Sequence, residues 1–132
     1  MHVLFHIIVV TYVQHLKKIL THILDSYAVL EFIEDKPGDL AKIEKEMLKI
    51  NGFMKVVSNK IDLEKIPNSD FKIIKIKFSQ YLENYSFEKE IVTMTPLYSD
   101  DVSRIKNMRI KILEALKHKN MINDIKELLD TL

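Results

Sequence analysis

Hydrophobic and polar positions follow one another along this chain in two rhythms, one typical of strands and one typical of helices. The apolar segment 3–11 is rich in β-branched residues and predicts a buried strand, and the three- and four-residue spacing within 13–27 predicts a helix. One continuous helix from about His6 to Tyr27 is the alternative interpretation, because a single helical stripe is also formed by Val9, Val13, Leu16, Leu20 and Ile23.

The next part of the chain predicts a strand followed by a helix. Residues 28–35 alternate between apolar and polar types, as a strand with one buried face does. Residues 39–50 then place apolar side chains on one helical stripe. Asn51 and Gly52 both tolerate the left-handed backbone conformation, so we expect this helix to end there.

Two strand-like segments, 53–63 and 71–80, come after this helix. The polar residues 65–70 between them predict a long hairpin connection. The segment 81–98 fits a short helix or loop followed by a strand that Pro96 ends.

The C-terminal third of the chain predicts two helices. Residues 99–101 are short polar side chains of the kind that cap a helix start, and 102–118 form an amphipathic helix. Asn120 interrupts the pattern, and 121–132 predict a last helix.

These elements together predict a single α+β domain over residues 1–132. We expect a ferredoxin-like antiparallel sheet of three to five strands with helices on one face. The core would span 28–98, and residues 99–132 would form a helical C-terminal extension.

Composition narrows the class of protein. The 132 residues carry 20 basic and 19 acidic side chains, a formal net charge of +1, which argues against a broadly basic nucleic-acid coat. The absence of cysteine excludes a disulfide scaffold, a zinc ribbon and thiol catalysis. Segment 3–13 holds eleven residues, too few to span a bilayer, and positive charge does not precede it as in a secretory signal. We therefore expect a cytoplasmic protein with no membrane partner.

The two glycines of the chain bracket the helix at 39–50. Before it, Asp35, Pro37, Gly38, Asp39 and Leu40 form a turn in which the proline prepares a helix start and Gly38 permits close backbone approach. Free amides at a helix start suit a carboxylate or another anion. A simple strand-to-helix turn explains the same residues without a ligand.

This arrangement resembles the ACT domain, a small regulatory fold that binds amino acids beside metabolic enzymes. The family pattern is a strand, an acidic or Asn residue, any residue, Pro-Gly, any residue, Leu, a helix, Gly and a second strand. The resemblance covers about residues 28–80. The sequence departs from the pattern at Met54 and Lys55, in the segment 81–98 and in the strand and helix that precede the motif.

The resemblance implies a non-catalytic regulatory module that binds a small metabolite, such as an amino acid, at a dimer interface. Asp35 would bind the amine, and the amides of Gly38 to Leu40 the carboxylate. Exposed strand edges in the segments 3–13 and 71–78 also predict a homodimer.

Other candidate sites are less specific. The five histidines are too scattered to hold a metal, although a helical N-terminus would place His2 and His6 one turn apart, where chelation is possible. Adjacent acids point apart, and two glycines cannot supply a phosphate-binding loop. We therefore expect no metal, no cofactor and no catalytic residues. The alternative function is protein interaction or nucleic-acid association, although we do not expect nucleic acid as the main partner. It would act through the basic helix 102–119, with the patch formed by Arg104, Lys106, Arg109, Lys111 and Lys117.

Overall fold

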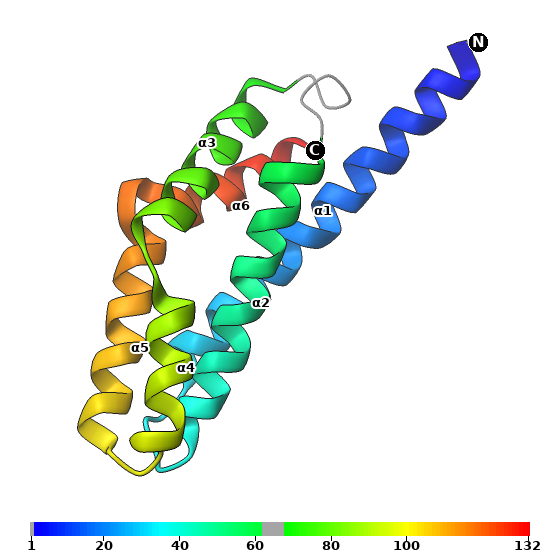
Figure 1. Cartoon of the computed structure of the whole chain (residues 1–132). Helices are drawn as coiled ribbons and strands as arrows, with labels where there is room; N and C mark the ends of the chain where they lie inside the picture. Colours follow the sequence, from blue (N-terminus) through cyan, green and yellow to red (C-terminus); the bar gives the residue numbers. More distant parts are fainter. Residues whose placement is uncertain (1, 62–67) are drawn as a thin grey trace.

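Helices form all of the regular structure that is described for this chain. The computed structural model describes residues 2–61 and 68–132, with side chains from residue 11 onward. The described residues contain no strand, so the predicted α+β ferredoxin-like sheet is wrong. The elements are α1 (His2–Phe32), α2 (Asp39–Lys60), α3 (Ser69–Asn84), α4 (Phe87–Leu97), α5 (Val102–Lys117), a 3₁₀ turn (His118–Asn120) and α6 (Met121–Thr131) (Figure 1).

The first helix replaces two predicted strands. Residues 3–11 and 28–32 both belong to α1, so the continuous-helix alternative is the correct one and the helix runs five residues past Tyr27. Short apolar segments cannot be assigned by periodicity alone. Here the stripe continues without a break through Leu16, Leu20, Ile23, Tyr27 and Leu30, all of them buried.

The expected end of α2 at Asn51 and Gly52 is also wrong. The buried positions Ile43, Met47, Ile50, Met54 and Val57 recur at alternating intervals of four and three residues, which is a helical stripe. The predicted strand 53–63 is therefore helical as far as Lys60. Its last residues fall among 62–67, outside the described residues.

In α3, the predicted strand 71–80 is likewise a helix. Its buried side chains are Phe71, Ile74, Phe78 and Tyr81, spaced at three and four residues. The loop predicted at 65–70 lies partly outside the described residues, and Asn68 caps α3 by accepting hydrogen bonds from the amides of Asp70 and Phe71.

The ambiguous segment 81–98 contains the end of α3 and all of α4. Its predicted strand is wrong, because residues 87–97 are helical and bury Phe87 and Ile91 at a four-residue spacing. Pro96 lies in the last turn of α4 and does not prevent the helix from reaching Leu97.

The predictions for the C-terminal third are confirmed. Asp101 caps α5 by accepting a hydrogen bond from the Arg104 amide, and the helix runs over Val102–Lys117. Lys119 and Asn120 adopt the left-handed conformation, with φ of 54° and 62°, and so separate α5 from α6. Local capping and turn signals were sufficient to predict where these two helices begin and where they are separated.

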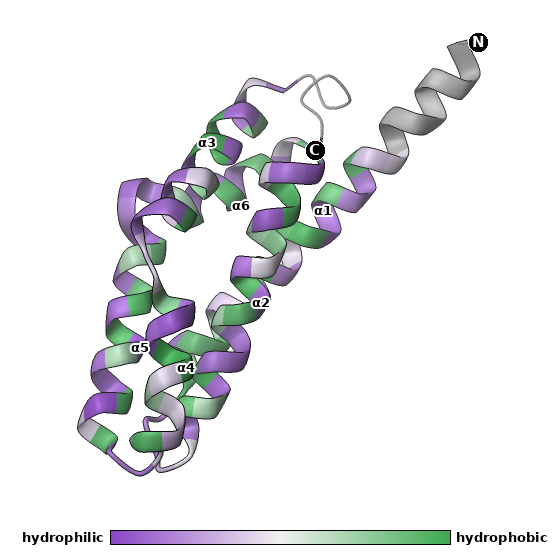
Figure 2. Ribbon diagram, viewed as in Figure 1, coloured by the Kyte–Doolittle hydropathy of each residue, from purple (hydrophilic) through white to green (hydrophobic). Residues whose placement is uncertain are grey.

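α2 lies at the centre of the bundle. It packs against α1, α3, α4 and α5, and α6 closes one end by contacting α1, α3 and α5. Figure 2 shows hydrophobic residues on the inner sides of these helices and hydrophilic residues on the outer sides. The N-terminal part of α1 extends past the other helices, whereas its C-terminal part packs along α2 (Figure 1).

Within the described residues, no helix is both long and apolar enough to cross a membrane.

Candidate functional site

The turn between α1 and α2 holds the residues predicted to bind a ligand. Gly38 has a φ of +88°, and Asp35 has a φ of 60°, which is rare for a residue other than glycine. Apart from Gly38 itself and its two chain neighbours, no heavy atom of the described residues lies within 4 Å of the position that a Gly38 Cβ would take. Gly38 is therefore required by the turn conformation, and the predicted close approach to another backbone segment is not found among the described residues.

The amides of this turn already have partners. The Gly38 N–H donates to the Ser99 carbonyl at 2.7 Å, and the Asp39 N–H donates to the Lys36 carbonyl at 2.9 Å. Leu40 is fully buried in the core. The bond to Ser99 ties this turn to the connection between α4 and α5, whereas the bond to Lys36 lies within the turn itself.

Asp35, expected to bind an amine, is paired with an arginine of this chain. The Arg109 side chain donates from Nε to Asp35 Oδ1 at 2.7 Å and from Nη2 to Oδ2 at 2.8 Å. Arg109 Nη1 also donates to the Leu30 carbonyl in the last turn of α1, at 3.4 Å. Both side chains are largely buried, and the Asp35 carboxylate raises the pKa of Arg109. This pair fixes α5 against the end of α1.

Asp39 stabilises the start of α2. Its Oδ2 accepts a hydrogen bond from the Lys36 amide at 2.9 Å, and its Oδ1 lies 3.4 Å from Lys42 Nζ. The amide hydrogen bond, helped by the lysines, lowers the pKa of Asp39 from its usual value. A negative charge in the first turn also suits the positive end of the helix.

An open groove of about 520 Å³ lies directly beside this turn. Its lining is more apolar than polar, and Phe32 within it is 83% exposed, an unusual value for a large aromatic side chain. Glu34 and Lys36 form an exposed ion pair at its edge, with 2.6 Å between Oε2 and Nζ, which raises the pKa of Lys36. The groove is lined by Ala28, Val29, Phe32, Ile33, Glu34, Lys36, Asp39 and Lys42.

The five residues of the predicted basic patch do not form one free cationic surface. Arg109 is paired with Asp35, Lys111 Nζ lies 2.9 Å from Glu90, and Lys117 interacts electrostatically with Tyr27. The Arg104 guanidinium stacks on the Tyr98 ring at 3.9 Å and also contacts Asp101. Lys106 remains as an exposed residue on the same helix.

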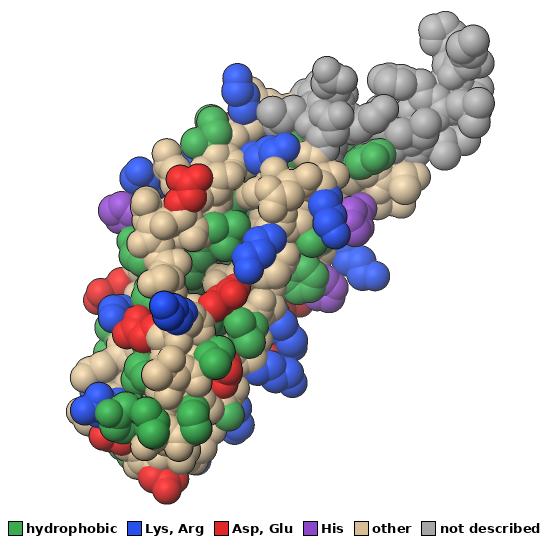
Figure 3. Space-filling view, viewed as in Figure 1, with side chains coloured by type: hydrophobic (Ala, Val, Ile, Leu, Met, Phe, Trp, Pro, Cys, Tyr) green, Lys and Arg blue, Asp and Glu red, His purple; other side chains and the backbone are tan. Residues whose placement is uncertain are grey.

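A second apolar surface lies near the connection between α4 and α5. Figure 3 shows hydrophobic side chains gathered at this end of the molecule. Leu97 is 67% exposed and Val102 is 48% exposed, at the end of α4 and the start of α5.

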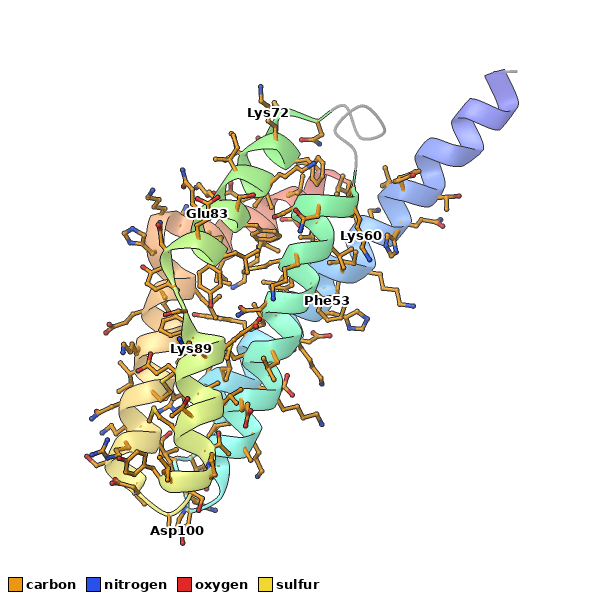
Figure 4. The ribbon with its side chains drawn as sticks, viewed as in Figure 1. Phe53, Lys60, Lys72, Glu83, Lys89 and Asp100 are labelled. Atoms are coloured by element: carbon orange, nitrogen blue, oxygen red, sulfur yellow. The ribbon has the colours of Figure 1, made fainter. Side chains whose placement is uncertain are left out.

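The described interior offers little reactive chemistry. Tyr81 is buried with its hydroxyl unpartnered, and burial strongly raises its pKa. The cavity that it lines is about 30 Å³, space for a single water. The described residues contain no cluster of side chains that could hold a metal. His22 stacks on Phe53 of α2, with ring centroids 5.2 Å apart (Figure 4 labels Phe53), whereas the side chains of His2 and His6 lie outside the described residues.

No family model, curated protein or solved structure matches this chain. Its function is therefore inferred from the geometry of the candidate surfaces.

The groove was missed because Phe32 and Val29 were assigned to a strand. In the helix they project from the end of α1, with Val29 44% exposed. The apolar stripe of the alternative helix over 6–27 continues to Leu30. A helix extended that far places Val29 and Phe32 on its outer side.

Proposed function

We propose that this chain is a non-catalytic interaction module that holds an amphipathic helix of a partner protein in the groove beside Phe32. The exposure of Phe32 carries the proposal, because a solvated aromatic ring next to an apolar groove is the usual anchor of a protein interface. Val29 and Phe32 are three residues apart on α1, and Ile33 directly follows the helix, so the three apolar side chains lie near one another at the end of α1.

The charges around the groove support a polypeptide partner. Glu34, Lys36 and Lys42 add charged side chains to the lining of the groove, and these side chains are 69%, 70% and 72% exposed. An apolar centre with a polar rim is the arrangement of transient protein interfaces. A helix with apolar residues at three- and four-residue spacing and charged flanks fits both features.

The groove is also held rigidly, which favours binding. The Asp35–Arg109 pair and the bond from Gly38 to Ser99 fix the turn that forms one wall. A preformed surface loses less conformational entropy when a partner binds.

A small metabolite, the ligand implied by the ACT resemblance, is the second candidate. The groove volume of about 520 Å³ lies in the usual range for small-molecule sites. The groups first expected to bind it are occupied within the chain: Asp35 by Arg109, and the amides of Gly38 and Asp39 by carbonyls. A metabolite would therefore contact the groove lining, with Lys36 and Lys42 nearest to a carboxylate.

A displayed library of helical peptides, selected on the wild-type chain, tests the proposal. Selected peptides should shift the amide NMR signals of residues 28–42, and Phe32→Ser should weaken them at least about tenfold. The matched control is Val92→Ser on α4, which removes an apolar side chain of 52% exposure elsewhere. Equal binding by the two variants would contradict the proposed site.

The metabolite candidate is separated by a thermal-shift screen over amino acids. A rise in melting temperature that Lys42→Glu abolishes would favour a metabolite in the groove. No rise with amino acids, together with peptide binding that depends on Phe32, would favour the protein partner.

A further inference from the structure

A row of lysines leads away from the groove beside Phe32 along α2. Lys42 lines the groove, and Lys45 and Lys49 follow at intervals of three and four residues. At about 100° and about 1.5 Å per residue, the three positions fall within an arc of about 60° and span about 10.5 Å of the helix. All three residues are exposed, so they form one positively charged row on the outer side of α2.

The surface beside this row is also hollowed. A shallow depression of about 530 Å³ lies on α2, and its lining includes Leu48, which is 38% exposed. Leu48 follows Lys42 by six residues, or about 9 Å along the helix axis. The groove therefore contains the first lysine of the row, and the depression contains the other two. The depression is lined by Ala41, Glu44, Lys45, Leu48 and Lys49.

The row presents its positive charge to the solution because the acids that contact it are buried. Lys42 Nζ lies 3.4 Å from Asp39, and Lys49 Nζ lies 3.4 Å from Glu46. The two lysine side chains are 72% and 47% exposed, whereas the two carboxylate side chains are 9% and 11% exposed. An approaching partner therefore meets the ammonium groups first. Figure 3 shows basic side chains along the edge of the molecule that α1 and α2 form.

An apolar stripe flanked by acids is the chemistry that fits this surface. A helix bound along α2 would present one turn to the row every 5.4 Å or so, about the spacing of the three lysines, so carboxylates three and four residues apart would meet them. Apolar side chains of the same helix would cover Phe32 and Leu48. A nucleic-acid strand fits less well, because its phosphates would also approach Glu44 in the depression, and Val29 and Leu48 offer its bases no ring for stacking.

We propose that the partner helix is acidic along one flank and lies over both the groove and the lysine row. Its apolar stripe contacts Phe32 and Leu48. Its carboxylates meet Lys42, Lys45 and Lys49. This inference rests on the proposed interaction in the groove and adds the charge of the partner. Opposite charges across an interface act mainly on the association rate and on the choice of partner, so these lysines decide which amphipathic helices are bound.

Selection from a helical peptide library with defined flanks tests this inference. The library keeps leucine at three- and four-residue spacing on one stripe and draws the flanking positions from Glu, Gln and Lys. Selection on the wild-type chain should enrich Glu. The best selected peptide should bind about tenfold more tightly than its Gln-flanked counterpart, the combined effect of several exposed ion pairs, and added salt should reduce this advantage.

Variants of the lysine row should change this preference in a defined way. Replacing both Lys45 and Lys49 by Glu should make the selection enrich Lys at the flanks, because the charge of the row is reversed. Replacing both by Gln, a milder change to α2, should remove the preference without reversing it. The matched control is Lys106→Glu on α5, at an exposed lysine outside this surface, which should keep the preference for Glu.

The failure of this inference and the failure of the proposed function give different results. Equal binding of Glu-flanked and Gln-flanked peptides that still depends on Phe32 would overturn the acidic partner and leave the interaction in the groove standing. Failure to select any peptide that depends on Phe32 would contradict the groove interaction, and this inference with it. Binding of an oligothymidylate strand that the Gln variant loses, without a preference for Glu in the peptides, would assign the row to nucleic acid instead.

Discussion

The two glycines of this chain have opposite conformational demands. Gly38 has a φ of +88°, whereas Gly52 lies inside the helix α2, and the space around both is open. A side chain at Gly38 is therefore opposed by backbone strain alone, and a side chain at Gly52 by nothing.

Substituting each glycine by alanine should consequently give changes of opposite sign. Gly38→Ala should lower the free energy of unfolding by about 1–2 kcal/mol, the cost of a left-handed alanine. Gly52→Ala should raise it by about 1 kcal/mol, since alanine favours the helix. Urea unfolding of the two variants measures both changes. Loss of stability in both would mean that crowding, and not backbone conformation, decides these positions.

The Asp35–Arg109 pair should be among the strongest single polar contacts of the molecule. Asp35→Asn retains a residue that tolerates positive φ but removes the charge and one acceptor. We expect the free energy of unfolding to fall by about 1.5–3 kcal/mol, the range for hydrogen bonds to charged groups. Asp100→Asn, at an exposed aspartate labelled in Figure 4, is the control and should change stability by no more than about 0.5 kcal/mol. Equal effects would show that the pair contributes nothing net.

Asp39 should make the stability of the chain depend on pH in the acid range. Because its folded pKa is lowered, its charge stabilises the fold above the unfolded pKa of about 3.9 and ceases to do so as the pH falls through the folded pKa. Relative to Asp39→Asn, the wild type should be more stable near neutrality by up to about 1 kcal/mol. Unfolding curves of both proteins should converge as the pH falls well below about 4. A constant difference at every pH would exclude a contribution from this charge.

At the scale of elements, the sequence predicted the ends of the C-terminal helices better than the secondary structure of segments in the middle of the chain. Asp101, Lys119 and Asn120 act within a few residues, so the start of α5 and its separation from α6 could be predicted. The strand assigned to 71–80 rested on alternating lysines, but Lys75 Nζ donates to the Ile61 carbonyl and Lys77 contacts Asp124. These lysines are half-buried because of tertiary contacts, and such contacts cannot be predicted from the spacing of residues along the chain.

Asn51 is a second case in which tertiary contacts decide the local structure, here against a residue that favours the end of a helix. Its helix-ending tendency is overridden because its Nδ2 donates to Glu88 Oε1 at 3.2 Å, on α4, and Met54 and Val57 extend the buried stripe. Packing of the following residues outweighs a local preference of a few tenths of a kcal/mol to about 1 kcal/mol.

The junction between α5 and α6 offers a prediction at this scale. Lys119 holds a left-handed conformation, so Lys119→Gly should relieve strain and raise the free energy of unfolding by up to about 1 kcal/mol. The same substitution at Lys126, exposed within α6, should lower it by about 1 kcal/mol. Thermal unfolding followed by circular dichroism compares the two variants. A loss in both would indicate that the Lys119 side chain, which bonds Gln80, outweighs the strain.

At the scale of the whole molecule, the sequence located the turn of the candidate site but not its surface. Gly38 and the helix start at Asp39 follow from local chemistry, and they are confirmed as a turn and a helix start. The occupation of Asp35 by Arg109, 74 residues later, could not be predicted from either residue's neighbours. The exposure of Phe32 likewise depends on where α2 and α5 lie, which is a property of the packed bundle.

The packed bundle should unfold as one cooperative unit. Its buried side chains form one continuous cluster that includes Ile43 of α2 and Leu128 of α6, both fully buried. Truncating either to alanine should lower the free energy of unfolding by about 2–5 kcal/mol, through lost burial and a residual cavity. Far-UV circular dichroism should report the helices, and tyrosine absorbance the packing around the two buried tyrosines, Tyr27 and Tyr81. In each variant the two signals should change at the same urea concentration, because loss of one side of the cluster exposes the other. Transitions that separate in Leu128→Ala but coincide in Ile43→Ala would instead show that the side of the cluster around Leu128 unfolds separately from the rest.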